Sequence, residues 1–124
     1  MDTVLGAAIA MLDARYAVDA RGRLESARHG GCVPRMVLAR TREGCVWRLR
    51  HDLGDRLVVA LARLAGREGP LPSPDAEGRR PPPERLGAIE RLLTDANPDT
   101  MPCSRGLELS DQPDGTLIEF WILD

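Results

Sequence analysis

Lysine is absent from this chain of 124 residues, and all 17 of its basic side chains are arginines. The absence excludes Schiff-base chemistry and every phosphate-binding loop that depends on a lysine. Aromatic residues make up only 3% of the sequence, which is too few to form a platform for stacking the bases of single-stranded nucleic acid. The net charge is −2, so the chain also lacks the strongly basic balance that is typical of duplex-binding proteins.

Long hydrophobic runs are missing as well. The apolar stretch at residues 4–12 is too short to cross a bilayer, and no basic residue precedes it, so it does not resemble a signal peptide. The three cysteines, Cys32, Cys45 and Cys103, are an odd number without close spacing. We therefore expect no disulfide framework, no membrane association and a cytoplasmic location.

The periodicity of apolar residues indicates an α+β protein that forms one domain over residues 1–124. We expect a small antiparallel sheet of four to six strands, with two or three helices packed on it. Helical spacing predicts helices over residues 3–14, 53–67 and 84–96, and Asp52 is the expected N-cap of the second. Alternating runs predict hairpins over residues 16–27, 36–50 and 106–124. Six of the ten prolines fall within residues 69–83, which predicts an exposed connector.

The hairpin at residues 36–50 carries the clearest local signal. Residues 42–44, Arg-Glu-Gly, fit a three-residue loop with the glycine in the left-handed conformation. In the resulting register Ala39 faces Trp47, and this apolar side of the hairpin belongs to the core. The other side then carries three arginines, Arg40, Arg48 and Arg50.

These arginines, together with Arg35 and Trp47, are the predicted binding residues for an anion. Guanidinium groups bind a carboxylate or phosphate through two parallel hydrogen bonds. The alternative interpretation is a sheet face whose arginines are solvated or paired with acids. The charge distribution is compatible with both: residues 15–50 hold nine arginines and three acids, and residues 95–124 hold seven acids and one arginine.

The last predicted strand has apolar side chains on both of its faces between Leu117 and Leu123. This pattern predicts either a central strand or a strand covered by a partner chain. We therefore expect self-association, as in a homodimer, or docking on a protein partner, with an anionic small molecule as a further ligand. No nucleic acid, membrane or cofactor is expected.

Several features between residues 16 and 69 occur together in one family. They are Arg35, the Arg40-Thr41 step, the Gly44 turn, Trp47-Arg48 and the helix start at His51-Asp52-Leu53. With these features the segment resembles the N-terminal region of a bacterial group of GNAT-type acetyltransferases, which precedes their acetyl-CoA-binding domain. The acetyl-CoA-binding loop itself is absent, because residues 28–32 have the wrong glycine spacing. The resemblance therefore implies a non-catalytic accessory module occurring alone.

The main alternative is a small enzyme in which Cys32 is the nucleophile. His29 or His51 would act as its base, and nearby arginines would lower the pKa of the thiol. A metal site would need His29, Cys32, Cys45 and His51 as four tetrahedral ligands. Their spacing matches no standard zinc motif, so we expect no metal.

Overall fold

A four-stranded antiparallel sheet with the strand order β4-β3-β6-β5 lies at the centre of the protein. The computed structural model describes residues 3–96 and 106–123. Its elements are α1 (Val4–Arg15), β1 (Tyr16–Val18), β2 (Leu24–Ala27), β3 (Met36–Thr41), β4 (Gly44–Leu49), α2 (Asp55–Ala65), α3 (Leu86–Ala96), β5 (Gly106–Asp111) and β6 (Leu117–Leu123). β1 and β2 form a separate two-stranded sheet. The predicted α+β class is confirmed.

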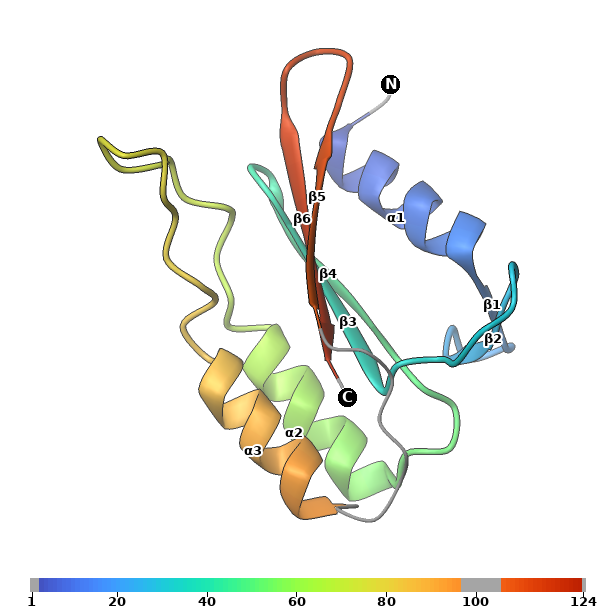
Figure 1. Cartoon of the computed structure of the whole chain (residues 1–124). Helices are drawn as coiled ribbons and strands as arrows, with labels where there is room; N and C mark the ends of the chain where they lie inside the picture. The colour runs from blue at the N-terminus through green and yellow to red at the C-terminus, as the bar shows by residue number, and fades with distance from the viewer. Residues whose placement is uncertain (1–2, 97–105, 124) are drawn as a thin grey trace.

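Helices cover both faces of the central sheet, and Figure 1 shows α1 on one side with α2 and α3 on the other. Leu12 and Phe120 belong to the buried cluster under α1, whereas Leu38 and Leu61 belong to the cluster under α2 and α3. β3 lies between the two layers, and all six of its residues are buried. β6 pairs with β3 on one side and β5 on the other, so the prediction of a central strand is confirmed.

The hairpin of β3 and β4 differs from its predicted register by one residue. Thr41 pairs with Gly44, so the loop has two residues instead of three. Leu38, rather than Ala39, lies opposite Trp47. The Thr41 hydroxyl donates to the Gly44 carbonyl oxygen at 3.0 Å and closes the tight turn. The apolar pattern could not define this register, because β3 is buried on both faces and its residues carry no inside-outside signal.

The helices differ in how their first N–H groups are satisfied. Thr3 is the N-cap of α1, and its side-chain oxygen accepts the Gly6 N–H at 2.9 Å. The N-cap of α2 is Gly54, which offers no side-chain hydrogen bond. Asp52, the predicted cap, instead accepts a hydrogen bond from the Arg50 Nε at 2.7 Å. None of the helices in the described residues is long and apolar enough to span a membrane.

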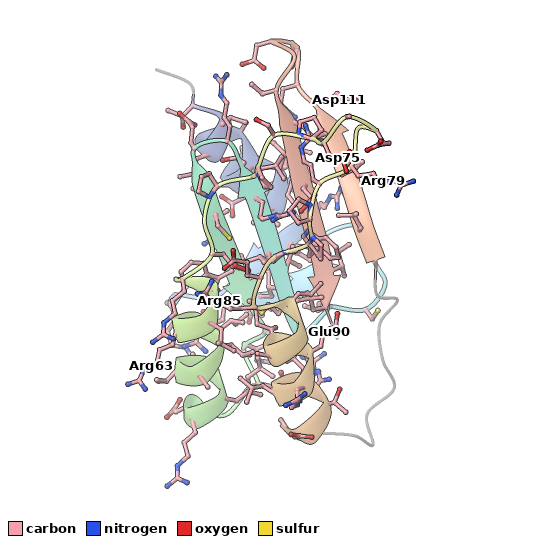
Figure 2. The ribbon with its side chains drawn as sticks, turned by 90° about the vertical axis from the view of Figure 1, so that its left-hand side faces the viewer. Arg63, Asp75, Arg79, Arg85, Glu90 and Asp111 are labelled. Carbon is pink, nitrogen blue, oxygen red and sulfur yellow. The ribbon has the colours of Figure 1, made fainter. Side chains whose placement is uncertain are left out.

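The proline-rich connector between α2 and α3, residues 69–83, crosses in front of the sheet in Figure 2. Most of its residues are exposed, but Pro83 is buried. The Leu71 N–H donates to the Thr41 carbonyl oxygen at 2.8 Å, and the Pro81 carbonyl oxygen accepts a bond from Arg40 at 2.8 Å. These bonds hold the connector against the end of β3.

Candidate anion-binding site

The one-residue difference in register separates the arginines that were predicted to share a face. Arg40 pairs with Cys45 and Val37 pairs with Arg48, so Arg40 and Arg48 lie on opposite faces of the sheet. Arg40 points to the side covered by α2, α3 and the connector. The prediction of one surface containing Arg40, Arg48 and Arg50 is therefore wrong.

Arg40 is a structural residue and not a ligand-binding one. Its guanidinium contacts the Glu119 carboxylate at 2.7 Å through Nε and at 2.6 Å through Nη2, and both side chains are only 5% exposed. The Pro81 carbonyl oxygen accepts a further bond, and the Trp121 indole N–H donates to the same carboxylate. Every charged group in this cluster is thus paired, as a buried charge requires. Arg40 therefore fits the alternative interpretation, in which the arginines of the sheet are paired with acids.

Arg35 and Arg50 line a hollow of about 350 Å³ beside the start of α2. Arg35 is buried and its Nη1 donates to the Leu93 carbonyl oxygen of α3 at 2.6 Å. The Arg50 Nη1 donates to the Val33 carbonyl oxygen at 2.9 Å, while its Nε binds Asp52. Burial would raise the pKa of Asp52, but the Arg50 hydrogen bond and charge outweigh this effect and lower it. These two arginines mainly join elements of the fold.

Arg48 and Trp47 line a second hollow, of about 250 Å³, at the open side of β4. The turn between β1 and β2 brings Arg21 and Arg23 to the same hollow. Its remaining wall contains Gly22, Leu49, Val58 and Ala62. Because neighbouring residues of a strand point to opposite faces, Trp47 lies on the face covered by α2 and Arg48 on the face covered by α1, and they border the hollow from the two sides of the sheet edge. Three arginines and an apolar helix face therefore border one hollow, and arginines are suited to binding an anion. Arg21 and Arg23 were not among the predicted binding residues.

The position of Arg21 and Arg23 is set by the tight turn at residues 19–23. The Asp19 Oδ1 accepts the Arg21 N–H at 2.8 Å and the Arg23 N–H at 3.0 Å, and Gly22 has a φ of +79°. The bond from the Arg23 N–H is the main reason that the pKa of Asp19 lies below its usual value. Residues 75–79 repeat the sequence pattern Asp-Ala-x-Gly-Arg and the same backbone bonds. These hydrogen bonds fix the backbone of the turn and so fix the positions from which the Arg21 and Arg23 side chains extend.

Two guanidinium nitrogens of the arginines that line this hollow are buried without a hydrogen-bond acceptor among the described residues. They are the Arg23 Nη1 and the Arg48 Nε. Arg48 forms an ion pair with Asp13 of α1, whose Oδ1 lies 3.7 Å from the Arg48 Nη2, beyond hydrogen-bond distance. Arg21 contacts the Asp19 carboxylate at 3.3 Å and the His51 carbonyl oxygen at 3.4 Å. The arginines around this hollow thus carry more hydrogen-bond donors than the described residues supply acceptors.

The cysteine and histidine hypotheses find no support in this arrangement. Cys32 is disulfide-bonded, although the cysteine spacing implied no disulfide framework, and a sulfur in that state has no thiolate to act as a nucleophile. Burial, followed by the charge of Glu68, raises the pKa of the Cys45 thiol to about 12. His29 and His51 are exposed, and no group of potential ligands in the described residues could hold a metal ion.

The fold and the site define a small α+β protein with an arginine-lined hollow between a sheet edge, a turn and a helix. The chain matches no family model, no curated protein and no solved structure. The physical character of the hollow is therefore the basis for assigning a function.

Proposed function

We propose that the protein is a non-catalytic binding module that recognises a small anion in the hollow lined by Arg21, Arg23 and Arg48. The observation that carries the proposal is the pair of buried guanidinium nitrogens, the Arg23 Nη1 and the Arg48 Nε, that have no acceptor in the described residues. A buried donor without a partner costs about 1–3 kcal/mol, and a small rotation of either guanidinium toward a carboxylate or phosphate bound in the hollow would remove this cost.

The apolar wall narrows the class of ligand. Trp47, Val58 and Ala62 line the same hollow as the arginines, so the ligand carries an apolar or planar part next to its anionic group. The volume of about 250 Å³ favours a small molecule or a single side chain over a long polymer. A phosphate or carboxylate on a small organic group fits both conditions.

The proposal keeps the accessory role that the resemblance to acetyltransferase N-terminal regions implies, and it shifts the binding residues. Arg48 and Trp47 remain in the site, Arg21 and Arg23 join it, and Arg40 leaves it. The alternative of a cysteine-dependent enzyme loses its nucleophile through the disulfide at Cys32.

Inorganic phosphate is the simplest probe for this site. We expect phosphate to raise the melting temperature of the full chain more than chloride does at the same ionic strength, and to change the fluorescence of Trp47. Arg23→Met and Arg48→Met should each weaken phosphate binding by about tenfold or more, because each removes a charge-assisted hydrogen bond. Isothermal titration calorimetry measures the affinity directly.

Arg63→Met is the matched control, because it removes the same charge from an exposed position on α2, where Figure 2 shows Arg63 pointing away from the molecule. We expect this variant to bind phosphate as the unmodified chain does. If all three variants lose affinity equally, only the overall charge matters and the proposed site is wrong. Equal binding by all four proteins would also contradict it.

A further inference from the structure

The edge of the central sheet at β5 offers a second surface, independent of the arginine-lined hollow. In the described residues β5 pairs with β6 alone, and Figure 2 shows it as the outermost strand on the right. The pairing with β6 runs through all six residues of β5 without a bulge. The outer edge of β5 therefore presents a regular row of backbone N–H and C=O groups, and such a row is a template for pairing with another strand.

The side chains of β5 add an apolar surface to this edge. Leu107 is 47% exposed and Leu109 is 61% exposed, and alternation along the strand places both on the face that α3 covers elsewhere. Beside them lies a hollow of about 200 Å³, lined by Leu107, Trp121, Leu123 and Glu90 among others. The exposed leucines thus extend the apolar surface of this face of the sheet to its outer edge at β5.

Several of the devices that normally protect an edge strand are absent from β5, although it carries two acidic side chains, Glu108 and Asp111. It contains no proline, no lysine or arginine and no bulge. The opposite edge is different, because Leu24 of β2 forms a bridge with Arg50 just beyond β4, and the His51 N–H donates to the Leu24 carbonyl oxygen at 3.0 Å. The end of β4 is therefore partly covered, whereas no other strand of the described residues pairs with the outer edge of β5.

We propose that β5 pairs in antiparallel fashion with β5 of a second copy of this chain, joining the two four-stranded sheets into one continuous sheet. A two-fold axis perpendicular to the sheet keeps equivalent faces on the same side, so odd-numbered residues meet odd-numbered residues. With the axis at Glu108, Leu107 lies opposite the Leu109 of the second copy, and Leu109 lies opposite its Leu107. All four leucines then form one apolar cluster.

Neighbouring registers are less favourable. An axis at Leu109 would place each Leu107 opposite the carboxylate of an Asp111, which leaves a charge against an apolar side chain. An axis at Glu108 brings the two Glu108 side chains together on the face covered by α1, where each forms an ion pair with Arg15 of its own chain. The paired arginines reduce the repulsion that two bare carboxylates would have. The strand is thus complementary to itself in this register.

Sedimentation velocity over a wide range of concentrations tests the proposal on the full chain. We expect a reversible equilibrium between monomer and dimer. Leu109→Lys should weaken self-association by about tenfold or more, because one substitution places a charge at both ends of the two-fold interface. Val59→Lys is the matched control, since Val59 is 50% exposed on α2 and lies outside β5, and it should leave the equilibrium unchanged.

Cysteine substitution tests the register. Under mild oxidation Glu108→Cys should form a disulfide between two chains, because residues directly opposite have Cα atoms about 4.5–5.5 Å apart. Asp111→Cys should not, since its two copies would lie roughly 20 Å apart along the strands. The unmodified chain, treated identically, controls for the native cysteines.

A monomer at all concentrations overturns the proposal, as does a dimer that Val59→Lys weakens and Leu109→Lys does not. A dimer in which Asp111→Cys cross-links and Glu108→Cys does not overturns the register. Loss of phosphate binding with an intact dimer would affect only the function proposed for the arginine-lined hollow.

Discussion

Two arginine-containing sites in this protein have opposite balances of hydrogen-bond donors and acceptors. At the centre of the sheet Arg40 meets the Glu119 carboxylate and the Pro81 carbonyl oxygen, and the cluster is almost completely buried. At the open side of β4 the Arg23 Nη1 and the Arg48 Nε are buried without any acceptor in the described residues. The residue type is the same, yet only the second site leaves donors for a ligand.

The difference shows why arginine content alone does not locate a binding site. A buried arginine is tolerated when the fold supplies a carboxylate, and such a pair is then a part of the core. An arginine that the fold leaves without an acceptor carries a desolvation cost that a ligand can remove. The acceptor balance of each guanidinium, and not its position in a charge-rich segment, separates structural arginines from binding ones.

Among these variants, Arg40→Ala is expected to lower the free energy of unfolding the most. The substitution leaves the Glu119 carboxylate buried without its main partner, and we expect a loss of about 3–5 kcal/mol in the free energy of unfolding. Urea denaturation measures this loss. The double variant Arg40→Met/Glu119→Leu should recover much of it, because the two apolar side chains need no partner. A loss below about 1 kcal/mol for Arg40→Ala would show that the pair is not structural.

Cys45, which lies next to Arg40 on the paired strand, gives a second test through pH. Its folded pKa of about 12 lies above the ordinary thiol value of 9.0, so the folded state holds the proton more tightly than the unfolded state. Stability from this group is therefore complete below pH 9 and is lost as the pH rises toward 12. Thermal denaturation across this range should show a steeper decline for the unmodified chain than for Cys45→Ser. Identical slopes would mean that Cys45 is not buried as described.

Arg23→Met is expected to change the free energy of unfolding the least when no ligand is present. The substitution removes a buried donor that has no partner and keeps a long apolar side chain, so the free energy of unfolding should stay equal or rise by at most about 1 kcal/mol. Chemical denaturation in a chloride buffer measures it. A loss as large as that of Arg40→Ala would mean that Arg23 is a structural residue, and the two sites would no longer differ.

Sequence patterns predicted the elements better than the contacts between them. The helix expected at residues 3–14 is α1, Val4–Arg15, and the one expected at 84–96 is α3, Leu86–Ala96. These assignments depend on periodicity within one segment, which local sequence records directly. The prediction of the register between β3 and β4 was wrong because residues Met36–Ala39 are all apolar. No alternation of apolar and polar residues therefore shows which side chains share a face.

The candidate site was predicted only in part for a related reason. Arg48 and Trp47 were recognised from the hairpin that contains them, but Arg21 and Arg23 reach the hollow from a turn more than twenty residues earlier. Nothing local to the turn indicates that it meets β4 and α2. The acceptor for Arg35, the Leu93 carbonyl oxygen, is likewise a backbone atom 58 residues away and has no signature in side-chain sequence.

The sequence by itself determined the α+β class, the approximate extent of the helices and strands, and the exclusion of lysine chemistry. These properties follow from composition and from short-range periodicity. Only the tertiary structure decided, within residues 3–96 and 106–123, which arginines are paired, which nitrogens lack an acceptor and which edge of the sheet has no further strand beside it. Each of these depends on groups far apart in the chain, because the balance of donors and acceptors is settled only when the elements pack.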